Sequence, residues 1–349
     1  GDRTAAVHHE LGVEITPSEH GLAVTDSLRL SGAVAPDDGG GYRFVLHAGL
    51  APEVTTEGWR REGVADPSSA GFFGLNATTD TVGADVPLEG WRLVPEGNAS
   101  EPVVLSYGGT LHYELATSGE EYQRSFSETP GIIDERGVFL AGTSFWVPTF
   151  GDGLMTFQLE VVGLQPPWDV VSQGRRVRHE ILEEGSRATT WRLDHPTEEV
   201  YLVAGPWHRF EDVSGKVDIF AFLREDDPAL ASKYLEATKR YLRLYQGMLP
   251  AYPYASFALV ENFWETGYGM PGFTLLGPRV IRFPWILTSS YPHELLHNWW
   301  GNAVYVDYGR GNWCEGLTAY MADHLFAEQR GEGEIYRRAT LKKYSDFVS

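Results

Sequence analysis

The sequence predicts an α+β protein of two domains, with an all-β saddle or sandwich over residues 1–224 and a mixed helix-and-strand domain over 225–349. Three observations lead to this prediction. The chain of 349 residues is longer than a single hydrophobic core usually serves. Its first two-thirds alternate apolar and polar residues in short runs. Helical spacing of apolar residues begins only near residue 228.

The first domain is predicted to consist of short strands. Runs such as GLAVTDSLRLSG and LMTFQLEVVG alternate apolar and polar residues and are separated by Gly, Pro and Asp. Alternation with period two, together with enrichment in Thr, Val, Tyr and Phe, is typical of antiparallel strands. Such strands recur over most of the domain without a long helix, which predicts a sandwich or a large saddle-shaped sheet.

The second domain is predicted to open with a helix. Asp226 or Asp227 can cap it, Pro228 suits its first position, and Gly247 and Pro250 end it. Between these signals, apolar residues recur every three or four positions, as on an amphipathic helix. Further strands are expected at 256–263 and 273–277, and further helices at 291–300, 315–330 and near the end of the chain.

Composition narrows the class of partner. The formal net charge is −20, and the acidic excess lies in the first two-thirds of the chain. This charge disfavours nucleic acid and anionic membranes as partners. The single cysteine, Cys314, excludes an internal disulfide framework. The sequence contains no run of 18 apolar residues, the length expected of a membrane-spanning helix.

The stretch HELLH predicts a metal site. On a helix, His293 and His297 share one face and can bind the same ion, while Glu294 lies beside them as a candidate general base. A catalytic zinc takes three protein ligands, and Glu315 on the next helical pattern supplies the third. The alternative for Glu315 is an acid placed at a helix start by the helix dipole. The sequence therefore predicts one Zn²⁺ per chain that activates water for hydrolysis.

Three polar residues near these ligands are candidates for orienting them. Asn298, Asn302 and Asp323 could hydrogen-bond to ligand side chains, with ordinary capping or surface roles as the alternative. The tryptophans nearby are expected to pack around the two helices rather than to contact substrate; they are Trp299, Trp300 and Trp313.

The flanks of the motif resemble a known family. HELLHNWWGN followed by NWCEGLTAY is similar to the membrane-alanyl aminopeptidase family of gluzincin zinc metallopeptidases, which has the patterns H-E-x-x-H-x-W-x-G-N and W-x-x-E-G-x-x-x-Y. The resemblance implies a thermolysin-like catalytic domain at 225–349 behind an N-terminal saddle domain. It implies zinc ligation by His293, His297 and Glu315, with Glu294 as the base and peptides or proteins as substrates. We interpret the chain as a divergent bacterial member.

The sequence departs from the family where substrate binds. The family motif G-x-M-E-N corresponds to GYGMPGFTLLG, so the resemblance implies substrate contacts by Gly269, Met270, Pro271 and Gly272. Pro271 stands where the family's glutamate holds the free α-amine of the substrate. Proline carries no charge and no donor, so selectivity for free N-termini is in doubt.

Two other acids are candidates for the amine-binding role. Glu261 or Glu265 could take it, with a solvated loop position as the alternative for each. In the N-terminal domain, the segment 137–146 corresponds to the family's second amine contact and contains no acid.

The resemblance also implies a catalytic tyrosine about 65 residues after the glutamate ligand, beyond Ser349. We therefore expect a C-terminally truncated chain with a further helical domain outside it, one that holds zinc but hydrolyses poorly.

Two classes of function remain open. The first is a zinc metallopeptidase with endopeptidase or relaxed exopeptidase selectivity. The alternative is a non-catalytic, zinc-containing peptide-binding or scaffold protein. Retention of Glu294 favours the enzyme, because a structural zinc site needs ligands but no base. The acidic composition, the start without a methionine and the lack of disulfides suggest a periplasmic, cell-surface or secreted protein, with the cytoplasm as the alternative.

Overall fold

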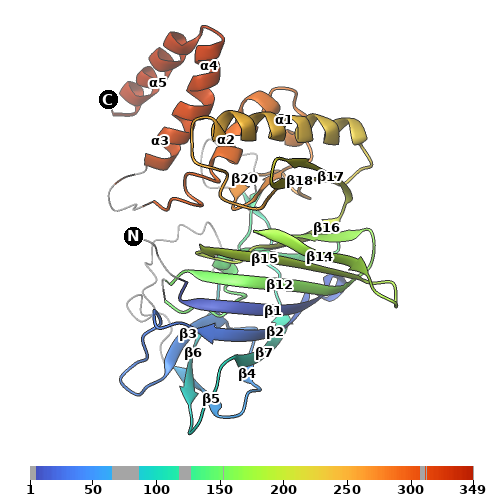
Figure 1. The fold of residues 1–349 in the computed structure, drawn as a ribbon, viewed down its shortest axis with the longest axis vertical. Coiled ribbons are helices and arrows are strands. Elements are labelled where there is room, and N and C mark those ends of the chain that lie inside the picture. Colours follow the sequence, from blue (N-terminus) through green and yellow to red (C-terminus); the bar gives the residue numbers. More distant parts are fainter. Residues whose placement is uncertain are drawn as a thin grey trace. The chain divides into compact units, whose positions relative to one another are not determined.

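The computed structural model describes residues 5–64, 86–117, 127–151, 153–306, 311 and 313–348. The chain divides into two compact units, Gly1–His208 and Arg209–Ser349. This division comes earlier than the predicted 224/225, because a hairpin of residues 208–223 joins the sheet of the second unit. The mixture of sheets and helices confirms the predicted α+β class (Figure 1).

Over the described residues, the first unit contains a seven-stranded sheet (Figure 1). In spatial order its strands are β14 (Arg175–Ile181), β15 (Arg187–Thr197), β12 (Met155–Leu164), β1 (Val7–Thr16), β2 (Gly21–Leu30), β7 (Val103–Thr110) and β4 (Glu53–Val54). Alternate residues of β1 are buried, as the alternation in the sequence predicts. The pairing of β1 with β12 is parallel. Alternation shows which side chains face the core, but it does not reveal strand direction.

Smaller sheets complete the described part of this unit. They are β10 (Gly131–Asp134), β11 (Gly137–Leu140), β16 (Leu202–Pro206) and β13 (Trp168–Val171); β3 (Tyr42–His47), β6 (Leu88–Pro95) and β5 (Trp59–Val64); and β8 (Ala116–Thr117) with β9 (Ser127–Glu128). Short 3₁₀ turns lie at Pro17–Glu19 and Gly142–Ser144. Large buried side chains such as Phe44, Trp146, Phe157 and Trp191 fill the core.

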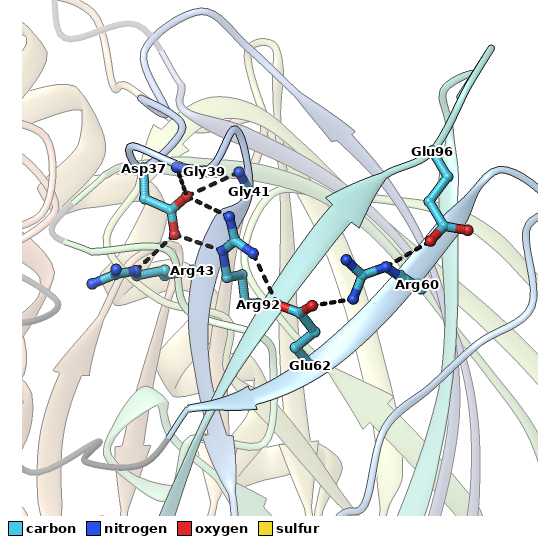
Figure 2. A network of polar contacts seen from close by, with 8 residues as sticks. All are labelled: Asp37, Gly39, Gly41, Arg43, Arg60, Glu62, Arg92 and Glu96. Atoms are coloured by element: carbon cyan, nitrogen blue, oxygen red, sulfur yellow. Dashed lines mark hydrogen bonds and ion pairs between the residues drawn. The ribbon is translucent and has the colours of Figure 1, made fainter.

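A ladder of charged side chains fastens the loop before β3 (Figure 2). Asp37 accepts two hydrogen bonds from the Arg92 guanidinium, both of 2.7 Å, and others from Arg43 and from backbone amides of the loop. The hydrogen bonds from Arg92 are the main reason that the pKa of Asp37 is held well below its usual range. The ladder continues from Arg92 through Glu62 and Arg60 to Glu96.

A second charged group of this unit is buried. The Asp169 side chain of β13 is 1% exposed, and its Oδ2 lies 3.0 Å from His179 Nε2 and 3.4 Å from Arg187 Nη1. Burial by itself raises the pKa of Asp169, but the hydrogen bond from His179 and the nearby charges outweigh it, and the pKa lies below its usual value. The carboxylate therefore stabilises the folded state in its charged form.

Asp169→Asn is expected to lower the free energy of unfolding by about 3–5 kcal/mol near neutral pH, because a buried pair loses one partner. The pKa of Asp169 is lower when folded, so this contribution is complete above the unfolded value and fades as the pH falls through the folded one. Urea denaturation at several pH values measures it. The gap between wild type and variant should shrink below about pH 4. A constant gap, or an equal effect of Asp194→Asn at an exposed ion pair, would contradict this.

In the second unit, the described residues form a five-stranded sheet with helices around it (Figure 1). Its strands in order are β17 (His208–Ser214), β18 (Val217–Leu223), β19 (Ser256–Glu261), β21 (Phe273–Leu276) and β20 (Gly267–Met270). The helices are α1 (Pro228–Gln246), α2 (Ser290–Leu296), α3 (Trp313–Ala319), α4 (Leu325–Gln329) and α5 (Gly333–Val348). 3₁₀ turns lie at Val280–Arg282 and Ile286–Thr288, and a π-helical turn lies at Tyr320–His324.

Helix α1 confirms the predicted start and end signals. Asp227 is the cap residue, its carboxylate accepting from the Leu230 amide at 2.9 Å, and Pro228 is the first helical residue. Gly247 follows the last turn. Helix α1 lies against β18 (Figure 1). Its apolar residues, such as Leu235 and Leu242, are buried. Among the described residues, no helix is long and apolar enough to span a membrane.

Candidate metal centre

Three side chains of the second unit converge at the ends of α2 and α3. His293 lies on α2, and His297 directly follows the last residue of that helix. Glu315 lies in the first turn of α3. The two His Nε2 atoms are each 3.3 Å from an oxygen of the Glu315 carboxylate. One potential ligand atom from each residue lies within 4.8 Å of the others. The structure thus brings together the three residues predicted as ligands.

Hydrogen bonds at Nδ1 fix the orientation of both rings. His297 Nδ1 donates to the Trp300 carbonyl oxygen at 3.1 Å, and His293 Nδ1 lies 3.1 Å from Asp323 Oδ2. With Nδ1 used in this way, both Nε2 atoms point toward Glu315. Two imidazole nitrogens and one carboxylate oxygen, all facing one point, are the donor set of a catalytic zinc, whose fourth position is left for water or substrate. The residues present therefore fit zinc.

Asp323 reaches His293 from a π-helical turn. Residues Tyr320–His324 form this turn between α3 and α4, in one continuous helical stretch. A π-helical turn changes which residues of a helix face its neighbour, and such turns are frequent at functional sites. Of the three candidates for orienting the ligands, Asn298, Asn302 and Asp323, it is Asp323 whose side chain contacts the His293 ring.

The charges around the two histidines differ. Burial lowers the pKa of His293, but hydrogen bonds to Asp323 and Glu315 outweigh it and raise the pKa to about 10. For His297 burial prevails, and its pKa is lowered. Hydrogen bonding to His293 lowers the pKa of Glu315. The centre therefore favours positive charge opposite Glu315, and a bound divalent cation would supply that charge in place of the proton on His293.

Glu294 lies on α2, and its carboxylate lies beside strand β20. Its side chain is half-buried, and burial raises its pKa to about 7. Strand β20 passes so close that a Cβ atom on Gly269 would lie 2.7 Å from Glu294 Oε2. A glycine at this position leaves room for the carboxylate. A carboxylate with a pKa near neutrality suits a general base, which must accept a proton and release it again.

The four predicted substrate-binding residues lie on the β20–β21 hairpin. Gly269 and Met270 end β20, and Pro271 and Gly272 form the turn before β21. Gly269 is half-buried, whereas Met270, Pro271 and Gly272 are buried. The position of Gly269 beside Glu294 is compatible with substrate contact, and the role of all four remains a prediction.

The two candidate substitutes for the amine anchor have structural partners. Glu261 is 2% exposed and forms an ion pair with Arg282. Glu265 accepts from the backbone amide and the guanidinium of Arg279, at 3.0 and 2.9 Å. Each acid thus links a strand or loop to the 3₁₀ turn at Val280–Arg282. Neither acid is simply solvated in a loop, which is the alternative for each.

The sequence did not indicate the position of Glu199, a further acid beside the segment 137–146. In the first unit, the Glu199 carboxylate accepts from the Gly142 amide at 2.5 Å and from the Tyr201 hydroxyl at 2.6 Å. Burial raises the pKa of Glu199. The segment 137–146, which contains no acid of its own, therefore lies against one supplied from 57 residues away. No local pattern in the sequence signals this contact.

Asp323→Asn is expected to weaken zinc binding by about 10- to 100-fold, because the carboxylate holds His293 in its binding orientation. Competition with a chromogenic chelator measures the affinity. Asp346→Asn, at an exposed ion pair on α5, is the control and should leave the affinity unchanged. Equal affinities of all three proteins would show that Asp323 does not orient the ligand.

Solved structures include proteins with a similar fold. A zinc metallopeptidase of the M1 family from Deinococcus radiodurans, a variant bound to a Tyr-Ser-Ala substrate, superposes with a TM-score of 0.67 at 17% identity, covering 98% of this chain and 75% of that one. The chain has the fold of the M1 zinc metallopeptidases. A structure described as a two-domain M1 zinc metallopeptidase, bound to L-tryptophan, gives a TM-score of 0.65 at 18% identity, covering 99% and 76%.

Yeast LTA4 hydrolase also has a similar fold, with a TM-score of 0.62 and 13% identity, covering 98% of this chain and 51% of that one. These matches confirm the predicted architecture of an N-terminal β domain followed by a catalytic domain. No protein-family model matches the sequence. No curated protein matches it either. The likeness is one of fold, so activity has to be argued from the residues of the site.

Proposed function

We propose that the protein is a zinc-dependent peptidase that hydrolyses peptide bonds with Glu294 as general base. The convergence of His293, His297 and Glu315 beside Glu294 is the observation that carries this proposal. Held by these three ligands, zinc supplies a Lewis acid that polarises the scissile carbonyl and lowers the pKa of a water molecule. The M1 fold of the structural neighbours supports the same chemistry.

Glu294 and strand β20 have different roles in the proposed reaction. Glu294 accepts a proton from the attacking water and passes it to the leaving amine, a role suited to its pKa of about 7. Strand β20 lies at the edge of the five-stranded sheet, where an extended peptide can add as a further strand. Such a peptide would run along Gly269, and therefore past Glu294.

The same hairpin bears on selectivity. Pro271 is buried in the turn and offers no charge to an α-amine. Glu261 and Glu265 are held in ion pairs with arginines. We therefore propose that cleavage does not require a free N-terminus, as in an endopeptidase or a relaxed exopeptidase.

Matched peptides with free and N-acetylated termini test this proposal. We expect the two rates, followed by mass spectrometry, to agree within about threefold, because Pro271 carries no charge and Glu261 and Glu265 are held in ion pairs with arginines. A buried ion pair with the amine would instead favour the free peptide by about 30-fold or more. That outcome would restore aminopeptidase selectivity. Cleavage of neither set by the zinc-loaded protein would favour the non-catalytic alternative.

A further inference from the structure

The residue after His297 joins the metal-binding helix to the β20–β21 hairpin. Asn298 is fully buried, and its Oδ1 accepts from the Gly272 amide at 2.8 Å and from the Tyr252 hydroxyl at 3.1 Å. Its Nδ2 donates to the Leu295 carbonyl oxygen at 2.8 Å. The amide is thereby anchored to α2 on one side and to the hairpin on the other.

The turn that Asn298 holds is tight. Met270 pairs with Phe273, so Pro271 and Gly272 are the only residues between the two strands. Gly272 has φ +83°, which fits the third position of a type II turn with proline at the second. In such a turn the Gly272 amide has no partner within the hairpin, and a buried amide needs one. Asn298 provides it.

The other side of Gly272 is also fixed. Its carbonyl oxygen accepts from the Ala258 amide of β19 at 3.0 Å. The turn is therefore held by the sheet through its carbonyl group and by α2 through its amide. Without Asn298, the attachment to the sheet would remain, while this direct bond to the helix that carries the ligands would be lost.

The position of the turn matters for Glu294. Gly269 lies three residues before Gly272 and is packed against the Glu294 carboxylate. A shift of the turn relative to α2 therefore moves β20 relative to the base. We propose that Asn298 is a positioning residue, whose amide clamps the Pro271–Gly272 turn and thereby aligns β20 with Glu294 for an extended peptide. This inference rests on the proposed peptidase function.

Asn298→Leu tests the clamp, because leucine has the same branched arrangement of four side-chain heavy atoms but no acceptor. In the zinc-loaded protein, hydrogen exchange at the Gly272 amide should accelerate by about tenfold or more, the equivalent of about 1.4 kcal/mol. Zinc content should be unchanged. For peptide hydrolysis, KM should rise by about tenfold and kcat should change by less than about threefold, because the hairpin is correctly docked for less of the time.

Two further variants separate the clamp from packing. Tyr252→Phe removes the other donor to Oδ1 but leaves the bond to Gly272, so exchange at Gly272 and KM should stay near wild type. Asn298→Ala removes the acceptor without filling its space and should behave like Asn298→Leu. The inference is overturned if exchange at Gly272 is unchanged in both Asn298 variants, or if Tyr252→Phe has the same effects. It is also overturned if both Asn298 variants lose zinc or fail to fold, since Asn298 would then support the helix itself.

Kinetics and exchange separate this inference from the proposed function. If the wild type cleaves no peptide, the peptidase proposal fails, and exchange at Gly272 alone decides whether Asn298 holds the turn. If the wild type cleaves peptides and Asn298→Leu accelerates exchange with KM unchanged, the clamp exists but does not position substrate, and the inference fails while the peptidase proposal stands.

Discussion

Glu294→Gln is expected to abolish peptide hydrolysis while zinc stays bound. Glutamine has the shape of the glutamate but cannot take a proton from water, so the rate should fall by about 100- to 10,000-fold. The metal ligands are His293, His297 and Glu315, none of which is altered. Hydrolysis of a peptide mixture and the zinc content of the same sample should be measured together.

A matched control guards against a general effect of removing an acid. Glu236→Gln changes an exposed glutamate on α1, which is paired with Lys239. It should hydrolyse peptides at the wild-type rate. The account of Glu294 is contradicted if Glu294→Gln keeps more than about a tenth of the wild-type rate. A loss of tenfold or less is smaller than the effect of removing a general base. Loss of zinc from this variant would instead give Glu294 a structural role.

Glu315→Ala is expected to release zinc. The carboxylate is one of three protein ligands and faces both Nε2 atoms at 3.3 Å. Removing one ligand of three should weaken zinc binding by about 1,000-fold or more. Titration against a competing chelator measures the affinity, and loss of hydrolysis at limiting zinc should accompany the change.

The control for Glu315 is another helical acid. Glu334→Ala alters an exposed glutamate at the start of α5, which pairs with Arg338. If any acid at the start of a helix had the same effect on zinc binding, the two variants would show the same zinc affinity. Wild-type affinity in Glu315→Ala would show that the residue is such a helix-start acid and not a ligand.

Much of the fold could be predicted because it depends on local signals. Alternation placed the strands of the first unit, and Asp227, Pro228 and Gly247 placed the ends of α1. The parallel pairing of β18 with β19 could not be predicted, because it joins segments on either side of α1. This pairing draws residues 208–223 into the second unit, ahead of the predicted boundary.

Two local features were missed for chemical reasons. The glycine-rich segment that forms β20 carries too little side-chain pattern to indicate a strand. Helix α2 ends at Leu296 rather than at residue 300, since the Asn298 side chain donates to the Leu295 carbonyl. Side chains that bond to nearby backbone groups in this way compete with helix continuation.

In the candidate site, too, contacts between residues close in the sequence could be predicted, and contacts between distant residues could not. His293 and His297 share a helix turn, so their spacing alone predicts that they meet. Asn298 and Gly272 are 26 residues apart, and only the folded structure shows that the helix and the turn are joined. The sequence shows that Pro271 lacks the charge of the family's glutamate, and the structure shows that it forms the turn before β21.

The central claim is that zinc at His293, His297 and Glu315 makes this chain a peptidase. The most direct measurement strips the protein of metal, adds zinc back in steps, and follows cleavage of a peptide library by mass spectrometry. The account predicts no cleavage in the stripped protein and cleavage that grows with zinc up to one ion per chain. Cleavage that persists at full rate after zinc is removed, or no cleavage once one zinc is bound, would contradict it.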